Sequence, residues 1–197
     1  MSGLPNGWDE ISLSETGKII TGKTPSKNNV NDWGTKYNFI TPTDIKDDIK
    51  FIDKTNRYIS DDGKDRFKNM ILDEESIIVT CIGSDMGKVI MNKNIALTNQ
   101  QINSIVVNNN YDKDFIFYKL KASYRLLKRL AGSGSTMPLL NKSDFSNIKI
   151  KIPKIAEQKA IANILSSFDN KIELLKEQNK TLEITAQTIF KEWFIDF

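Results

Sequence analysis

The C-terminal segment, residues 157–197, constrains the fold more than any other part of the sequence. It contains neither Gly nor Pro and consists mostly of good helix formers, so it predicts a single long helix. Along this segment a set of residues is spaced alternately by four and three positions, as in a helix that keeps one side against a partner helix. We define this seam as Ile161, Leu165, Phe168, Ile172, Leu175, Asn179, Leu182, Ala186, Ile189 and Trp193.

Asn179 is the one polar residue of the seam and lies near its midpoint. A buried amide at such a position lowers the stability of a helix pair but specifies its register and partner. At ~1.5 Å per residue the seam is roughly 48 Å long, whereas a domain of about 150 residues is only ~25–30 Å across. We therefore expect the helix to pair with another molecule; packing against its own domain is the alternative.

Short runs of β-branched residues, separated by turn sequences, characterise the first 150 residues. The clearest turns are TGKTPSKNN (21–29) and NNNYDKD (108–114). The pattern predicts an α+β fold in which a sheet-rich globular domain, residues 1–155, precedes the coiled-coil helix of residues 157–197. Expected strands cover residues 38–41, 76–81, 88–91, 102–107 and 145–152, and one amphipathic helix with a basic face covers residues 115–130.

The absence of His and the presence of a single Cys, Cys81, exclude His-dependent hydrolysis, intrachain disulfides and multi-cysteine metal sites. No stretch reaches the ~18 apolar residues of a membrane helix, and residues 1–20 lack a signal-peptide pattern. Asp44 and the triplet Asp62-Gly63-Lys64 match the pattern of metal-dependent nucleases only loosely. We therefore expect a cytoplasmic, non-catalytic protein that holds no metal or cofactor and does not bind a membrane.

Charge is distributed unevenly along the chain. Residues 157–197 carry five lysines and seven acidic side chains, so this segment has a net charge of −2 and the rest of the chain +5. A basic domain joined to an acidic helix suggests nucleic acid as the partner of the domain and protein as the partner of the helix. Ordinary solvated surface is the alternative explanation.

Candidate DNA-binding residues lie in three parts of the domain. The turn GKTPS offers hydroxyls and lysines for phosphates, the sequence NQQI offers amides for adenine, and the basic helix leads into a Gly/Ser-rich joint, residues 131–136. Each segment has a structural alternative: GKTPS can be a plain surface turn, NQQI can cap a turn, and the basic residues can form a solvated helix face. The candidates are Lys23, Thr24, Ser26, Lys27, Gln100, Gln101, Arg125, Lys128, Arg129, Ser133, Ser135 and Thr136.

Several segments resemble the specificity (S) subunits of type I restriction-modification systems. They are LPNGWDEISLSETGKIITGKTPSK (4–27), WGTKYNFITPTDIK (33–46), NQQI (99–102), GSTMPLLNKSDFSNIKIKIPKIAEQKAIANILSSFDNKI (134–172) and TAQTIFKEWFIDF (185–197). The resemblance covers nearly the whole chain, in the family's order of target-recognition domain and then helical spacer. S subunits usually carry two of each, so the resemblance implies a half-subunit or the N-terminal half of a longer chain.

The resemblance implies how such a chain would act. A homodimer with antiparallel helices would place two identical domains on double-stranded DNA at a palindromic, bipartite site. DNA adenine methyltransferase subunits, which bring S-adenosylmethionine, would dock on the helix, and a restriction subunit would join them. The apolar residues outside the seam, Ile164, Leu174, Ile184 and Phe194, are the candidates for this docking. The alternative is a helical interaction module that reads no DNA and competes for the methyltransferase.

Overall fold

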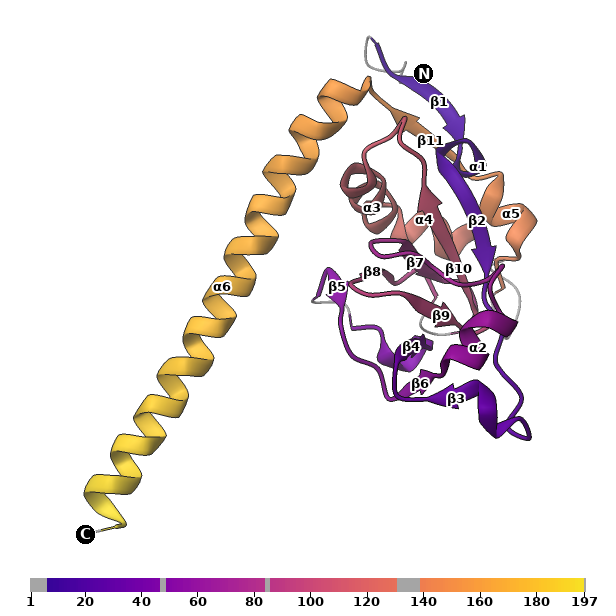
Figure 1. Ribbon diagram of the computed structural model, residues 1–197. Coiled ribbons are helices and arrows are strands. Elements are labelled where there is room, and N and C mark those ends of the chain that lie inside the picture. The colour runs from indigo at the N-terminus through magenta and orange to yellow at the C-terminus, as the bar shows by residue number, and fades with distance from the viewer. Residues whose placement is uncertain (1–6, 47–48, 84–85, 131–138, 197) are drawn as a thin grey trace.

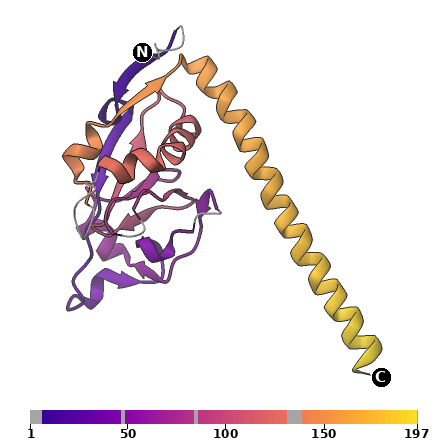
Figure 2. The same cartoon turned by 180° about the vertical axis from the view of Figure 1, so that it is seen from behind.

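The computed structural model describes residues 7–46, 49–83, 86–130 and 139–196. A sheet-rich domain comprises most of the chain, and the 40-residue helix α6 (Ile155–Phe194) extends from one end of it (Figure 1). Seen from behind, α6 stands away from the domain along most of its length (Figure 2). The predicted α+β fold with a long C-terminal helix is therefore confirmed.

A five-stranded sheet forms the centre of the domain. Its strand order is β2 (Gly17–Thr21), β10 (Ile102–Val107), β7 (Ile77–Thr80), β8 (Val89–Asn92) and β5 (Phe51–Ile52). All neighbours pair antiparallel except β5, which runs parallel to β8. All four residues of β7 are buried, because both faces of this sheet are covered.

A four-stranded sheet covers one face of the central sheet. Its order is β3 (Trp33–Gly34), β6 (Arg57–Ile59), β4 (Tyr37–Ile40) and β9 (Ala96–Thr98), with β4 and β9 parallel. Ile40 of this sheet packs with Ile78 and Ile90 of the central sheet in one buried cluster. The short helices η1 (Val30–Asp32), η2 (Pro42–Asp44) and α2 (Asp61–Arg66) lie in the connections between this sheet and the central one.

Helices and a small two-stranded sheet cover the other face. Ile77 and Val79, which alternate with Ile78 along β7, pack there with Phe117 of α3 and Phe145 of α5. The elements are β1 (Asp9–Ser12), which pairs with β11 (Lys149–Ile152), and α1 (Leu13–Thr16), α3 (Lys113–Ala122), α4 (Tyr124–Leu130) and α5 (Lys142–Ser146).

The predicted strands are confirmed as β4, β7, β8, β10 and β11, the last beginning at Lys149 rather than 145. The prediction of one helix over residues 115–130 is wrong, because the helix breaks at Ser123 into α3 and α4. The Ser123 hydroxyl donates to the Lys119 carbonyl at 2.8 Å, a local bond that competes with continued helix.

Helix α6 begins two residues before the predicted start and changes environment along its length. Gln158 and Ala162 are buried against the domain, and Ile161 packs at the edge of its core. Ile161, the first residue of the predicted seam, therefore contacts its own domain. From Asn170 to Asp196 every residue is exposed. No helix in the described ranges, α6 included, is long and apolar enough to cross a membrane.

Candidate nucleic-acid interface

The strand pairing of the central sheet gathers several loops at one edge. Thr21, the last residue of β2, lies opposite Asn103, and Thr80, the last residue of β7, lies opposite Ile102. The loop after β2, the loop after β7 and the turn before β10 therefore leave the sheet at the same edge, which we call the loop edge. It includes residues 22–29 and 99–101, two of the three segments that the sequence nominates for DNA contacts.

Two predicted DNA-binding segments contact each other directly at the loop edge. The Thr24 hydroxyl donates to Oε1 of Gln100 at 2.7 Å, although 76 positions separate the two residues. Gly22 lies against the backbone of Thr98 and Asn99 so closely that a Cβ there would overlap the Thr98 carbonyl oxygen. A glycine is required at this position, and the two segments form one continuous surface.

The loop of residues 22–29 has a definite conformation. Its Ser26 hydroxyl accepts a hydrogen bond from the Asn28 backbone N–H at 3.3 Å, and its Ser26 carbonyl accepts one from Nε1 of Trp33 at 3.1 Å. Lys23 and Lys27 are exposed on either side of the buried Pro25. The loop is thus a structured turn that presents two cations to solvent.

Gln100 and Gln101 occupy different environments. The Gln101 N–H donates to Oδ1 of Asn99, and Oε1 of Gln101 accepts from Nδ2 of Asn99, both at 3.0 Å. Gln101 therefore serves the turn itself, which is the alternative interpretation of the sequence NQQI. Gln100 is exposed beside Thr24, so it is the glutamine placed to meet a ligand.

Helix α4 lies beside the same edge. Gly87, in the loop after β7, has a φ of +88°, and a Cβ there would meet the ring of Tyr124 in α4 at 2.9 Å. Arg125, Lys128 and Arg129 are exposed on α4. The predicted contacts Ser133, Ser135 and Thr136 lie outside the described residues.

The three aromatic residues near β4 belong to the packing of the domain. Phe39 is buried, and its ring meets that of Trp33 edge-on at 5.2 Å. The Tyr37 hydroxyl donates to Oδ1 of Asp61 at 2.9 Å. Arg57, which the sequence did not nominate, stacks on Trp33 with its guanidinium carbon 3.8 Å from the ring centroid.

Asp44, the first carboxylate of the loose nuclease pattern, has structural partners. Oδ2 of Asp44 accepts from the Thr41 N–H at 2.9 Å, and Oδ1 accepts from Nδ2 of Asn56 at 2.8 Å. Asp62 and Lys64 lie on α2. Among the described residues, no group of three or more His, Cys, Asp or Glu side chains could hold a metal ion.

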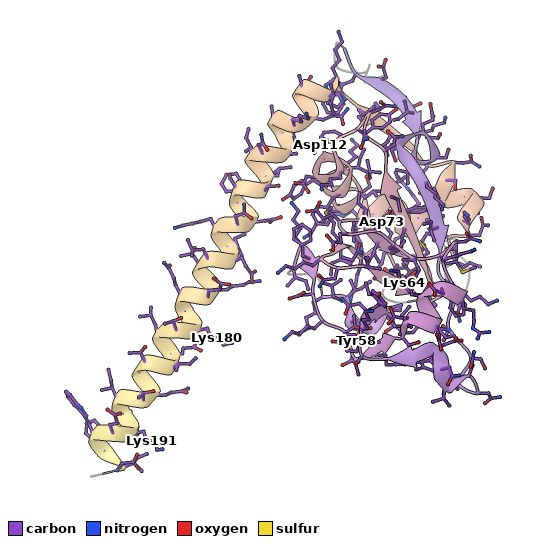
Figure 3. The ribbon with its side chains drawn as sticks, viewed as in Figure 1. Tyr58, Lys64, Asp73, Asp112, Lys180 and Lys191 are labelled. Atoms are coloured by element: carbon purple, nitrogen blue, oxygen red, sulfur yellow. The ribbon has the colours of Figure 1, made fainter. Side chains whose placement is uncertain are left out.

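At the other end of the domain, polar contacts attach the first turns of α6. Gln158 accepts from the Asp112 N–H at 2.9 Å and donates to the Pro153 carbonyl at 2.8 Å. In Figure 3, Asp112 marks this end, whereas Tyr58 and Lys64 mark the opposite end of the domain. The loop edge and the attachment of α6 are therefore separate sites.

A network of charged and hydroxyl groups extends this attachment along α6. The Tyr118 hydroxyl donates to Oδ2 of Asp169 at 2.6 Å, and Lys50 donates to the Ser166 hydroxyl at 3.0 Å while pairing with Asp114 at 3.1 Å. Burial, together with the bond to Asp169, raises the pKa of Tyr118 far above its ordinary value. Five side chains, three from the domain and two from α6, thereby hold the start of α6 against the domain.

The predicted docking residues Ile164, Leu174, Ile184 and Phe194 are all exposed, but they do not share one face of α6. They are ten residues apart, so at about 3.6 residues per turn each is rotated by about 80° from the previous one. Phe190, which is not among the predicted docking residues, is also exposed and stacks on Phe194 with ring centroids 5.1 Å apart. Apolar surface therefore surrounds the C-terminal turns of α6.

A family model of the type I restriction modification DNA specificity domain matches residues 5–184. The chain belongs to this specificity family. The MjaIX specificity subunit of Methanocaldococcus jannaschii is 33% identical over 98% of this chain and 45% of its own length. The HindI specificity subunit of Haemophilus influenzae is 34% identical over 86% of this chain and 38% of its own length. The chain thus spans about half the length of the specificity subunits it matches.

A solved S subunit from M. genitalium has the same fold. It superposes with a TM-score of 0.63 over 98% of this chain and 48% of that chain, at 20% identity. The resemblance to type I specificity subunits is therefore confirmed, in sequence and in fold. Membership of the specificity family also agrees with the prediction of a non-catalytic protein, since the relatives are named as specificity subunits of restriction enzymes.

Proposed function

We propose that this chain recognises a specific sequence of double-stranded DNA and directs a type I restriction-modification complex to it. The observation that carries the proposal is the loop edge, where the segments around Thr24 and Gln100 meet beside the cations of α4. Exposed lysines and arginines neutralise phosphates and position the domain, and exposed amides discriminate between bases. The proposed contacts are the residues nominated from the sequence, with Gln101 supporting the turn.

The chain acts as a homodimer through the seam of α6. From Leu165 onward, the large apolar side chains of the seam are 37–66% exposed, an unusual state for a soluble helix without a partner. The seam is self-complementary when reversed about Asn179: Leu165 and Trp193 each lie fourteen residues from it. An antiparallel pair therefore juxtaposes seam residues throughout and brings the two Asn179 amides together.

Two antiparallel helices place two identical loop edges at a distance from each other. Between Leu165 and Trp193 the paired helices would span roughly 42 Å at ~1.5 Å per residue. A two-fold protein of this kind matches two inverted half-sites that flank unread base pairs. The expected target is thus palindromic and bipartite.

The helices also bind the other subunits of the complex. Methyltransferase subunits, carrying S-adenosylmethionine, dock on the apolar residues outside the seam, and a restriction subunit joins this assembly. Because Ile164, Leu174, Ile184 and Phe194 point in different directions, one flat surface does not contact all four. Separate partner surfaces, or a partner that wraps around the helix, would share them.

Genome-wide sequencing of adenine methylation tests the reading role directly. Cells that carry this protein with its cognate methyltransferase are compared with cells that lack it. We expect a new methylated motif that is divided and palindromic. A stable complex with the methyltransferase but no new motif would contradict the proposal.

Cysteine cross-linking tests the arrangement of the dimer. Cys81 is a suitable background, because it is buried and its burial raises the pKa of the thiol to about 11. We expect Asn179→Cys to cross-link with itself, and Leu165→Cys to cross-link with Trp193→Cys when the two variants are mixed. Efficient cross-linking of Leu165→Cys with itself would indicate parallel helices and refute the antiparallel pair.

A second candidate is an interaction module that competes for the methyltransferase without reading DNA. The observation in its favour is that most large exposed apolar side chains belong to α6 rather than to the loop edge. Weak binding to DNA that does not depend on salt, in the presence of the methyltransferase, would support it. A steep fall of affinity with salt, together with discrimination between sequences, would support the reading role.

A further inference from the structure

We propose that Arg57 reads a guanine in each half-site, as part of the DNA-reading surface proposed above. Arg57 is exposed on β6, and its guanidinium carbon lies 3.8 Å from the ring centroid of Trp33 and 5.1 Å from that of Phe39. At 3.8 Å the guanidinium is in stacking contact with the indole, an arrangement that planar arginine adopts and lysine does not.

The support beneath Arg57 is rigid. Phe39 is 1% exposed and lies directly opposite Arg57 in the pairing of β4 with β6. Its ring meets that of Trp33 at 90°, and Nε1 of Trp33 donates to the Ser26 carbonyl. The side chain of Arg57 is therefore placed in advance, so that less conformational freedom is lost when it binds a ligand.

Arg57 belongs to the same surface as the loop edge. Ser26, to which Trp33 donates, lies in the loop whose Thr24 contacts Gln100. The other end of β4 reaches the same turn, because the Asn99 N–H donates to the Ile40 carbonyl at 3.1 Å. A duplex that touches Lys23, Lys27 and Gln100 therefore lies next to Arg57.

The N–H groups of Arg57 are left for a ligand. Among the described residues, its guanidinium makes no ion pair and no hydrogen bond, in contrast to Arg66, which pairs with the buried Asp32 at 2.7 Å. The two carboxylates nearest in sequence have other partners: Asp53 accepts from Nδ2 of Asn94, and Asp61 accepts from Lys36 and from the Tyr37 hydroxyl. The guanidinium of Arg57 is exposed, oriented and unpaired, and it lies beside a loop proposed to bind DNA. Its N–H groups are therefore available to a ligand from outside the domain.

Two acceptors on a duplex fit a guanidinium fork: O6 and N7 of guanine in the major groove, and the oxygens of a phosphate. Lys23 and Lys27 on the adjacent loop already serve phosphates, which need charge but no particular orientation. The stack on Trp33 holds the plane of Arg57 in one direction, and orientation is what recognition of a base edge requires. We therefore assign guanine, rather than phosphate, to Arg57.

The test compares Arg57→Lys and Arg57→Ala with the wild-type chain, each bound to its methyltransferase subunit. Lys149→Ala is the matched control, because Lys149 is an exposed cation on β11, away from the loop edge. Affinities are measured for the cognate duplex, for duplexes with each guanine replaced, and for an unrelated duplex over a series of salt concentrations. Complex formation with the methyltransferase subunit and a circular dichroism spectrum equal to that of the wild type verify that each variant is folded.

We expect both Arg57 variants to lose roughly tenfold to hundredfold in affinity for the cognate duplex and to lose discrimination at one guanine per half-site. The control should behave as the wild type does. If Arg57→Lys retains wild-type discrimination and only Arg57→Ala lowers the salt slope, Arg57 binds a phosphate and the assignment is wrong. If neither variant differs from the wild type, the assignment is equally wrong, while the reading role of the chain stands. A wild-type complex without sequence preference would overturn the reading role and this inference together.

Discussion

Gly22 shows how one residue joins two distant segments of the candidate interface. Its backbone N–H donates to the Ile102 carbonyl at 3.3 Å, and its Cα lies against Thr98 and Asn99. The sequence predicts a turn at this glycine, but not that the turn rests on residues 98–102. That information lies in the pairing of β2 with β10, which brings the two segments to one edge.

Replacing Gly22 with Ala should therefore disrupt the interface. Because a Cβ overlaps the Thr98 carbonyl oxygen, the loop must move, at a cost of about 1–3 kcal/mol in the free energy of unfolding. Denaturant unfolding measures this loss, and DNA affinity should fall with it. Asn28→Ala is the control for stability, since Asn28 is an exposed residue of the same loop. Equal stability of the two variants would show that the close approach has no energetic consequence.

Substitutions of Gln100 and Gln101 should have different effects, because the two side chains lie in different environments. Gln100→Ala should leave stability within about 0.5 kcal/mol of wild type but alter which sequence is methylated. Gln101→Ala removes a bond to Asn99, a side chain that is only 8% exposed, and should lower stability by about 1 kcal/mol. Thermal unfolding and methylation sequencing together separate these outcomes. If Gln101→Ala alters the methylated sequence and Gln100→Ala lowers stability, the roles assigned to the two glutamines are wrong.

Among the elements, α4 has the strongest electrostatic consequence. Replacing Arg125, Lys128 and Arg129 together with Ala should lower the slope of log affinity against log salt by up to about 2.7, since each phosphate contact contributes about 0.9. Binding measured between low and physiological salt gives the slope, for cognate and unrelated duplexes alike. An unchanged slope would mean that α4 faces solvent in the complex, as the alternative interpretation of its sequence holds.

The attachment of α6 should depend on pH through Tyr118. The pKa of Tyr118 is raised in the folded chain, so its neutral form is the one that the network stabilises. Its contribution is present in full below the ordinary tyrosine pKa of about 10 and is lost as pH rises above that value. Hydrogen exchange of α6 should therefore be constant, after correction for the intrinsic rate, up to about pH 10 and faster above it. In Tyr118→Phe this acceleration should be absent.

Patterns in the sequence predicted the elements that depend on local chemistry. The absence of Gly and Pro among good helix formers predicted α6, and runs of β-branched residues predicted β4, β7, β8 and β10. The sequence analysis missed β1 and β2 as well as the strands of only two to three residues, such as β3 and β5, because long-range pairing rather than local propensity specifies them. Arg57 was missed for the same reason: nothing in the sequence places it on Trp33, 24 positions earlier.

At the scale of the whole molecule, Asn179 should decide how two copies combine. In the proposed antiparallel pair the two amides would bond to each other, whereas other arrangements would bury them against apolar side chains. Asn179→Leu should therefore strengthen association but permit several registers. Cross-linking of Leu165→Cys in this background would then occur with itself as well as with Trp193→Cys. If the pattern of cross-links is unchanged, Asn179 does not specify the register of the pair.

The exposure of α6 beyond Asn170 has a consequence for the cell as well as for the molecule. If the seam is covered only by a second copy, the assembled reader forms in proportion to the square of the chain concentration when the chain is scarce. A small change in gene dosage would then become a larger change in the number of assembled readers. Protection of a genome by methylation would then begin only above a threshold of expression, and the affinity of α6 for a second copy would set that threshold.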